Sequence, residues 1–105
     1  MEKNILKFIK NHPRCSLAEL ESNIAGFKGE HIFGNLTSNI VFWPRMSKEA
    51  IDAIAKLVRE NKVDIEEVTA RIYAIDSDIL VNLPIGRNSK NYKRPHWVPL
   101  VFTVV

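Results

Sequence analysis

The chain has 105 residues, of which 46% are apolar and 26% charged, and this is the ordinary composition of a globular protein that folds as a single domain, here 1–105. One cysteine excludes an internal disulfide framework, and the net charge of +3 permits a polyanionic partner without requiring one. The charged start of the chain differs from a signal peptide, and no apolar run is long enough for a membrane span, so we expect a cytoplasmic protein.

The N-terminal part predicts two short helices. Residues 2–11 place apolar side chains on one face and lysines on the other, as in an amphipathic helix. Ser16 and Glu19 have the spacing of a capping box, in which each side chain meets the backbone N–H of the other residue. The second helix therefore begins after Ser16, and Gly26 suits its C-terminal stop.

A long link, residues 25–46, separates these helices from a third one. The link contains glycines and scattered aromatic residues, and within it residues 39–43 are typical of a short strand that Pro44 ends. The third helix, 47–61, is the clearest element, because Ser47 is a good N-cap and a regular apolar stripe follows it. Residues 1–61 thus form the helical part of the domain.

The rest of the chain, residues 62–105, predicts a small antiparallel β-sheet. Residues 71–75 and 79–83 flank a polar Asp-Ser-Asp turn at 76–78, which indicates a β-hairpin. A basic loop follows. The segment 98–105 is strongly β-prone, and the proline at its second position favours a strand that begins at a sheet edge.

This order of elements resembles a winged helix-turn-helix domain, so the expected fold is α+β with three helices followed by a small antiparallel sheet. The residues that carry the resemblance are the capped helix 16–24 and the run 54–65, which is similar to a helix end followed by a first wing strand. The link 25–46 departs from the pattern, since a helix-turn-helix joins its helices by about three or four residues. The acids on the third helix also disfavour reading of a duplex sequence.

Three further segments, 39–47, 83–85 and 92–102, are similar to small proteins carried by staphylococcal mobile elements, namely pathogenicity islands and cassette chromosomes. Such proteins are associated with element-borne replication genes. The resemblance implies an accessory factor in the replication of a mobile genetic element, acting beside a polymerase or helicase. It implies no catalytic residue.

The basic loop is the strongest candidate for a functional site. Residues 84–105 hold four basic and no acidic residues, whereas residues 1–83 hold eleven basic and twelve acidic ones. Cations interleaved with rings can contact phosphates and bases together, which predicts binding of nucleic acid. The expected partner is DNA, and single-stranded or nonspecific binding is favoured over reading of an operator sequence. The candidate binding residues are Arg87, Lys90, Tyr92, Lys93, Arg94, His96 and Trp97. In the alternative interpretation, the loop is a solvated surface and the Tyr92 and Trp97 rings anchor it to the core.

Nothing in the sequence indicates catalysis, so we expect neither an enzyme nor a cofactor. No glycine-rich phosphate loop is present. The histidines and the cysteine that could bind zinc, His12, Cys15 and His31, make an incomplete site, so no metal is expected. The acidic residues near the expected hairpin, Glu66, Glu67, Asp76 and Asp78, are typical of a solvated strand edge and turn.

A second function remains open, that of a protein-interaction adaptor without nucleic-acid binding. The aromatic residues of the link, Phe33, Phe42 and Trp43, either fill the core or expose an apolar patch for a partner. The segment 98–105 could equally dock a partner by strand addition. The partner expected from the resemblance is an element-encoded polymerase or helicase.

Overall fold

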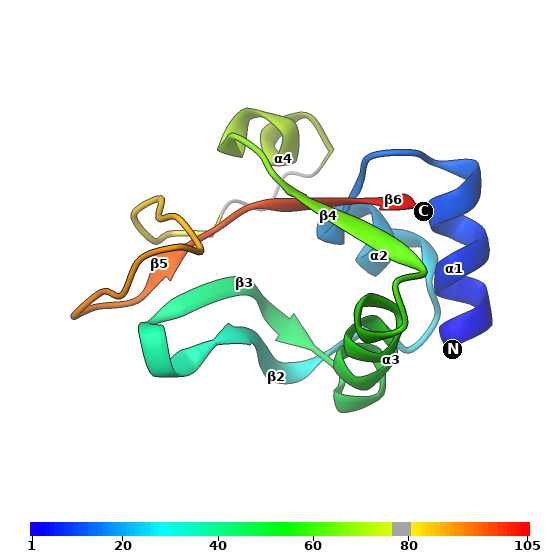
Figure 1. Ribbon diagram of the computed structural model, residues 1–105, viewed down its shortest axis with the longest axis horizontal. Coiled ribbons are helices and arrows are strands. Elements are labelled where there is room, and N and C mark those ends of the chain that lie inside the picture. Colours follow the sequence, from blue (N-terminus) through cyan, green and yellow to red (C-terminus); the bar gives the residue numbers. More distant parts are fainter. Residues whose placement is uncertain (77–80) are drawn as a thin grey trace.

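A computed structural model describes residues 1–76 and 81–105 (Figure 1). Its elements in chain order are α1 (Glu2–Asn11), β1 (Cys15–Ser16), α2 (Leu17–Asn23), β2 (Lys28–Asn35), the 3₁₀ turn η1 (Leu36–Ser38), β3 (Ile40–Met46), α3 (Lys48–Arg59), β4 (Val63–Glu67), α4 (Ala70–Asp76), β5 (His96–Trp97) and β6 (Leu100–Val104). The protein is therefore α+β, and within the described ranges it has four α-helices and two three-stranded sheets.

The three helices expected from the sequence are confirmed as α1, α2 and α3. The capping box of α2 is present: Ser16 Oγ accepts the Glu19 N–H at 3.1 Å, and a Glu19 carboxylate oxygen accepts the Ser16 N–H at 3.3 Å. At the start of α3, Ser47 Oγ accepts the Ala50 N–H at 3.1 Å. Each cap satisfies a backbone donor that the first turn of a helix leaves without a partner.

The first sheet has the order β1-β6-β4, with β6 antiparallel to both neighbours. The expectation that segment 98–105 begins at a sheet edge is therefore wrong, since β6 is the central strand. Pro99 lies before β6, so its missing N–H removes no hydrogen bond from the ladder. Its carbonyl oxygen accepts the Val68 N–H at 3.0 Å instead.

The second sheet comes from the link 25–46, which folds into an antiparallel hairpin of β2 and β3, with β5 parallel to β3. The strand expected at 39–43 is present, but it does not end at Pro44, because β3 continues to Met46. The register between β2 and β3 shifts between His31 and Phe33, opposite the proline. A proline is tolerated where the ladder is already interrupted by a bulge.

The prediction of a β-hairpin at 71–83 is wrong for its first strand, since residues 70–76 form α4. The expected turn and second strand fall partly on residues 77–80, which lie outside the described residues, and residues 81–83 are not in a strand. A short apolar run does not distinguish helix from strand by its periodicity. Tertiary packing decides here, because the Tyr73 ring lies 5.5 Å from the Trp43 ring and 5.1 Å from the Trp97 ring.

Tyr73 also joins two backbone segments inside the core. Its hydroxyl accepts the Leu17 N–H at 3.0 Å and donates to the Leu100 carbonyl oxygen at 2.5 Å. We expect Tyr73→Phe to lower the free energy of unfolding by about 1–3 kcal/mol, because two buried backbone groups lose a partner. Urea unfolding measures this difference.

Tyr92→Phe is the matched control, since it removes a hydroxyl that accepts a hydrogen bond in an exposed loop. We expect a change within about 0.5 kcal/mol for it. Equal losses in the two variants would contradict the structural role of the Tyr73 hydroxyl.

The buried apolar side chains of the described residues form one cluster, to which helices and both sheets contribute. Its fully buried members include Ile5, Ile9, Leu17, Leu20, Phe27, Trp43, Ile54, Leu57, Trp97 and Phe102. Along the longest axis of the molecule, α1 and α3 lie at one end. The turn between β2 and β3, together with the loop that leads into β5, lies at the other end.

Candidate nucleic-acid interface

The cations of the basic loop are exposed, and no acidic residue in the described part of the chain forms an ion pair with them. Arg87, Lys90, Lys93 and Arg94 all lie on the segment before β5, and within the described part of the chain none of them forms an ion pair. Some cations elsewhere are paired, such as Arg14 with Glu66, Arg45 with Glu21, Lys48 with Asp52 and Lys56 with Glu2. The loop therefore presents four cations that form no ion pair with a described carboxylate.

The base of the loop is closed by hydrogen bonds around Trp97. The Trp97 N–H donates to the Pro84 carbonyl oxygen at 2.8 Å, and the Gly86 N–H donates to the Trp97 carbonyl oxygen at 2.9 Å. The Trp97 side chain is 1% exposed, and its Nε1–H donates to the Phe42 carbonyl oxygen at 3.2 Å. Of the two interpretations of Trp97, this burial supports the anchor over a platform for a base.

The middle of the loop is held by the turn between β2 and β3. The Tyr92 N–H donates to the Ser38 carbonyl oxygen at 3.0 Å, and Asn39 Nδ2 donates to the Tyr92 carbonyl oxygen at 2.7 Å. The His96 N–H donates to the Asn39 carbonyl oxygen at 2.9 Å. Sequence reasoning missed Ser38 and Asn39. A signal existed, because asparagine tolerates the left-handed conformation that Asn39 adopts, with φ of 57°.

The rings of Tyr92 and His96 stabilise the loop by stacking on each other and by hydrogen bonds to its backbone. They are stacked, with centroids 3.8 Å apart and an angle of 17° between their planes. The Tyr92 hydroxyl accepts the Arg87 N–H at 2.8 Å, and His96 Nδ1 lies 2.8 Å from the Arg94 carbonyl oxygen. A Cβ atom at Gly86 would lie 2.7 Å from His96 Cβ, so this close packing requires glycine. Both rings are half-buried, and one face of each is covered by the other.

The lysines of α1 and Lys56 of α3 do not extend this surface. The lysines of α1 lie at the opposite end of the molecule from the loop (Figure 1). On α3, Lys56 Nζ lies 3.1 Å from a Glu2 carboxylate oxygen, and this hydrogen bond raises the pKa of the Lys56 ammonium above its usual value. Neither group adds to the candidate interface, which consists of the loop and the turn beside it.

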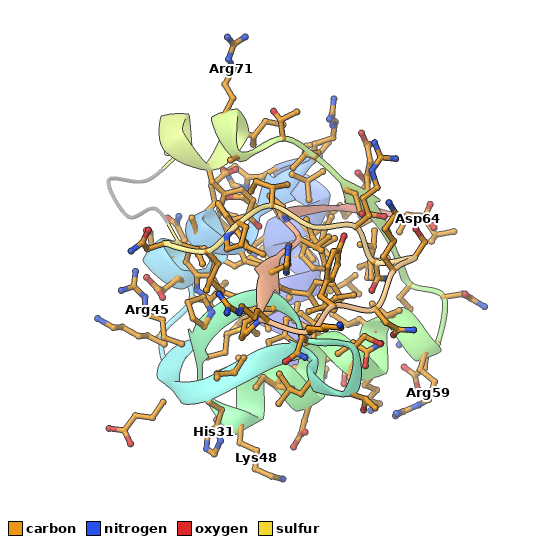
Figure 2. The ribbon with its side chains drawn as sticks, turned by 90° about the vertical axis from the view of Figure 1, so that its left-hand side faces the viewer. His31, Arg45, Lys48, Arg59, Asp64 and Arg71 are labelled. Carbon is orange, nitrogen blue, oxygen red and sulfur yellow. The ribbon has the colours of Figure 1, made fainter. Side chains whose placement is uncertain are left out.

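The residues considered for a metal site are not brought together. His31 is exposed on β2 and points away from the body of the molecule (Figure 2), whereas Cys15 is buried in β1. Among residues 1–76 and 81–105, no three His, Cys, Asp or Glu side chains are arranged to hold a metal ion. The carboxylate Glu67, expected to be merely solvated, accepts the Asn88 N–H at 3.1 Å and so lies beside the basic loop.

No helix in the described ranges combines the length and the apolar character that crossing a membrane requires. Comparison with protein-family models, with curated proteins and with solved structures finds no match to this chain. Function is therefore inferred from the geometry of the chain itself.

Proposed function

We propose that the protein is a non-catalytic nucleic-acid-binding module that contacts phosphates through Arg87, Lys90, Lys93 and Arg94, and that it serves as an accessory factor in the replication of a mobile genetic element. The observation that carries the binding proposal is the set of four exposed cations without an acidic partner in the described chain, on one anchored loop. The replication role rests on the sequence resemblance alone.

Anchoring of the loop supports binding for an energetic reason. The hydrogen bonds that its backbone forms with Ser38, Asn39 and Pro84 hold the loop in place before a ligand arrives. Ordering a free loop on a ligand costs conformational entropy, and a loop that is already held loses less. The charged ends of the side chains stay free to follow a phosphate backbone.

The order and pairing of the elements support the proposal of a winged-helix fold. Helices α1, α2 and α3 precede an antiparallel pair, β4 and β6, and β1 joins that pair at its other side. In a winged-helix domain the wing is the connection between the last two strands. The corresponding connection here spans 68–99 and contains the basic loop, which therefore occupies the position of a wing. In this proposal the hairpin β2–β3 is an insertion between the second and third helices of a helix-turn-helix.

The surface of α3 supports single-stranded or nonspecific binding rather than reading of a duplex sequence. Its exposed side chains include the acids Glu49 and Asp52, and Lys48 pairs with Asp52 at 3.3 Å. A helix in the major groove needs donors that are free to meet base edges and phosphates. Acids on that face would repel the duplex.

A second candidate function, the adaptor, is favoured by the open edge of β2. This strand ends the order β2-β3-β5, and nearby Ile32 and Leu36 are 49% and 57% exposed. An extended partner segment can add to such an edge. The version in which 98–105 docks the partner is less favoured, because β6 already has a neighbour on each side, with β1 paired at Val101 and Phe102. A replication polymerase or helicase is the partner that the sequence resemblance implies.

A salt titration tests the main proposal. If four cations contact a single strand of about 12 nucleotides, the slope of log K against log salt is about −2.8, so affinity falls about fiftyfold between about 50 and about 200 mM salt. Fluorescence anisotropy with a single strand and with the matching duplex measures both slopes. An affinity that does not change with salt concentration would exclude phosphate contacts. No binding to the single strand or to the duplex would favour the adaptor function.

A further inference from the structure

A groove of about 480 Å³ opens at the base of the basic loop. It lies between the segment that joins β4 to α4 and the first residues of the loop. Its lining consists of Glu67, Val68, Thr69, Ala70, Ile85, Gly86, Arg87 and Ser89. The volume falls within the range typical of small-ligand sites, about 300–1,000 Å³.

The lining combines three kinds of group that point to one kind of ligand. Ile85 is 53% exposed, although it is a large apolar side chain, and it offers a wall for a flat apolar surface. Arg87 supplies a cation without a carboxylate partner in the described chain. Glu67 supplies a carboxylate. A nucleotide has a flat base, an anionic phosphate and N–H donors at the base edge, so it meets all three.

Glu67 is the residue that narrows the choice of base. A carboxylate beside phosphates disfavours a polyanion, unless the ligand brings N–H donors to it. One of its oxygens accepts the Asn88 N–H at 3.1 Å, and the carboxylate has further acceptor sites for a ligand. It can only accept hydrogen bonds when ionised, so it selects a base edge that presents donors.

We propose that this groove binds one unstacked base of the bound strand, that Glu67 accepts hydrogen bonds from that base, and that guanine fits best. Guanine presents two adjacent donors, N1–H and N2–H, on its pairing edge, which match the two oxygens of a carboxylate. Adenine and cytosine each place an acceptor beside their amino group, and thymine flanks its single N–H with two carbonyl oxygens. Unstacked bases of single strands are read at this edge.

This inference rests on the proposed function, and it differs from a purely structural role of Glu67. If Glu67 only holds Asn88, its replacement by glutamine leaves base preference unchanged, because the glutamine oxygen still accepts the Asn88 N–H. If Glu67 reads the base, the same replacement removes the preference.

The experiment compares oligothymidylate with a strand of equal length that carries one central guanine, by fluorescence anisotropy. We expect the wild-type protein to bind the guanine strand about tenfold more tightly, as a bidentate base contact provides. Glu67→Gln should reduce this ratio to about twofold or less, since one acceptor oxygen of the carboxylate is lost.

Glu66→Gln is the matched control, because it removes the same charge from the same strand while alternation along β4 turns Glu66 to the opposite face, where it pairs with Arg14 at 3.0 Å. It should keep the tenfold preference. Equal binding of both strands by the wild type, or equal loss of preference in both variants, would overturn the inference and leave the proposed function standing. No binding to either strand would overturn both.

Discussion

Replacing Lys93 and Arg94 together by alanine is expected to weaken binding to a single strand by about 25-fold at about 0.1 M salt. Each phosphate contact releases about 0.7 of a counterion, which corresponds to about fivefold in affinity at this salt concentration. The slope of log K against log salt should also become shallower by about 1.4. Fluorescence anisotropy at several salt concentrations gives both numbers. Both side chains are exposed, so the variant should fold normally.

The control variant removes an equal amount of positive charge at the other end of the molecule. Lys3 and Lys7 are exposed on α1, which lies opposite the loop along the longest axis (Figure 1). Replacing both by alanine lowers the net charge equally. We expect its affinity to stay within about twofold of the wild type, since the lysines lie outside the interface and salt screens charges beyond a Debye length of about 10 Å. Equal weakening in the two double variants would show that net charge, and not the loop, determines binding.

The largest expected loss of stability follows from Trp97→Ala. The side chain is 1% exposed and packs edge-on against Tyr73, with ring centroids 5.1 Å apart. Removing a buried indole leaves a cavity, so the free energy of unfolding should fall by about 3–5 kcal/mol. The Phe42 carbonyl oxygen also loses the indole N–H as its donor. Urea unfolding followed by circular dichroism measures the loss.

A milder variant separates the anchoring role of Trp97 from contact with a base. Trp97→Phe keeps a buried ring and loses the hydrogen bond to the Phe42 carbonyl oxygen, so about 1–3 kcal/mol of stability should be lost. The folded variant should bind an oligonucleotide as tightly as the wild type does. A folded Trp97→Phe protein with binding more than about tenfold weaker would mean that the indole contacts a base.

The helices follow from the sequence because their signals are local. The capping box of Ser16 and Glu19, the N-cap Ser47 and the apolar stripes act within a few residues, so tertiary packing did not need to be known. The run 71–75 shows the opposite case. Its β-branched and aromatic residues favour a strand locally, but Tyr73 reaches Leu17 and Leu100 from a helix. Contacts between distant segments overrode the local preference.

The candidate site divides in the same way. The sequence by itself determined the cluster of cations from Arg87 to Arg94, because charge is a property of residue type and needs no fold. Only the tertiary structure decided which residues hold the loop in place and which residues lie beside its cations. Asn39 and Tyr92, separated by 53 positions, form one hydrogen bond, and Glu67 lies beside Asn88 after a separation of 21. Such contacts depend on how the sheets bring remote segments together, and no local pattern in the chain encodes them.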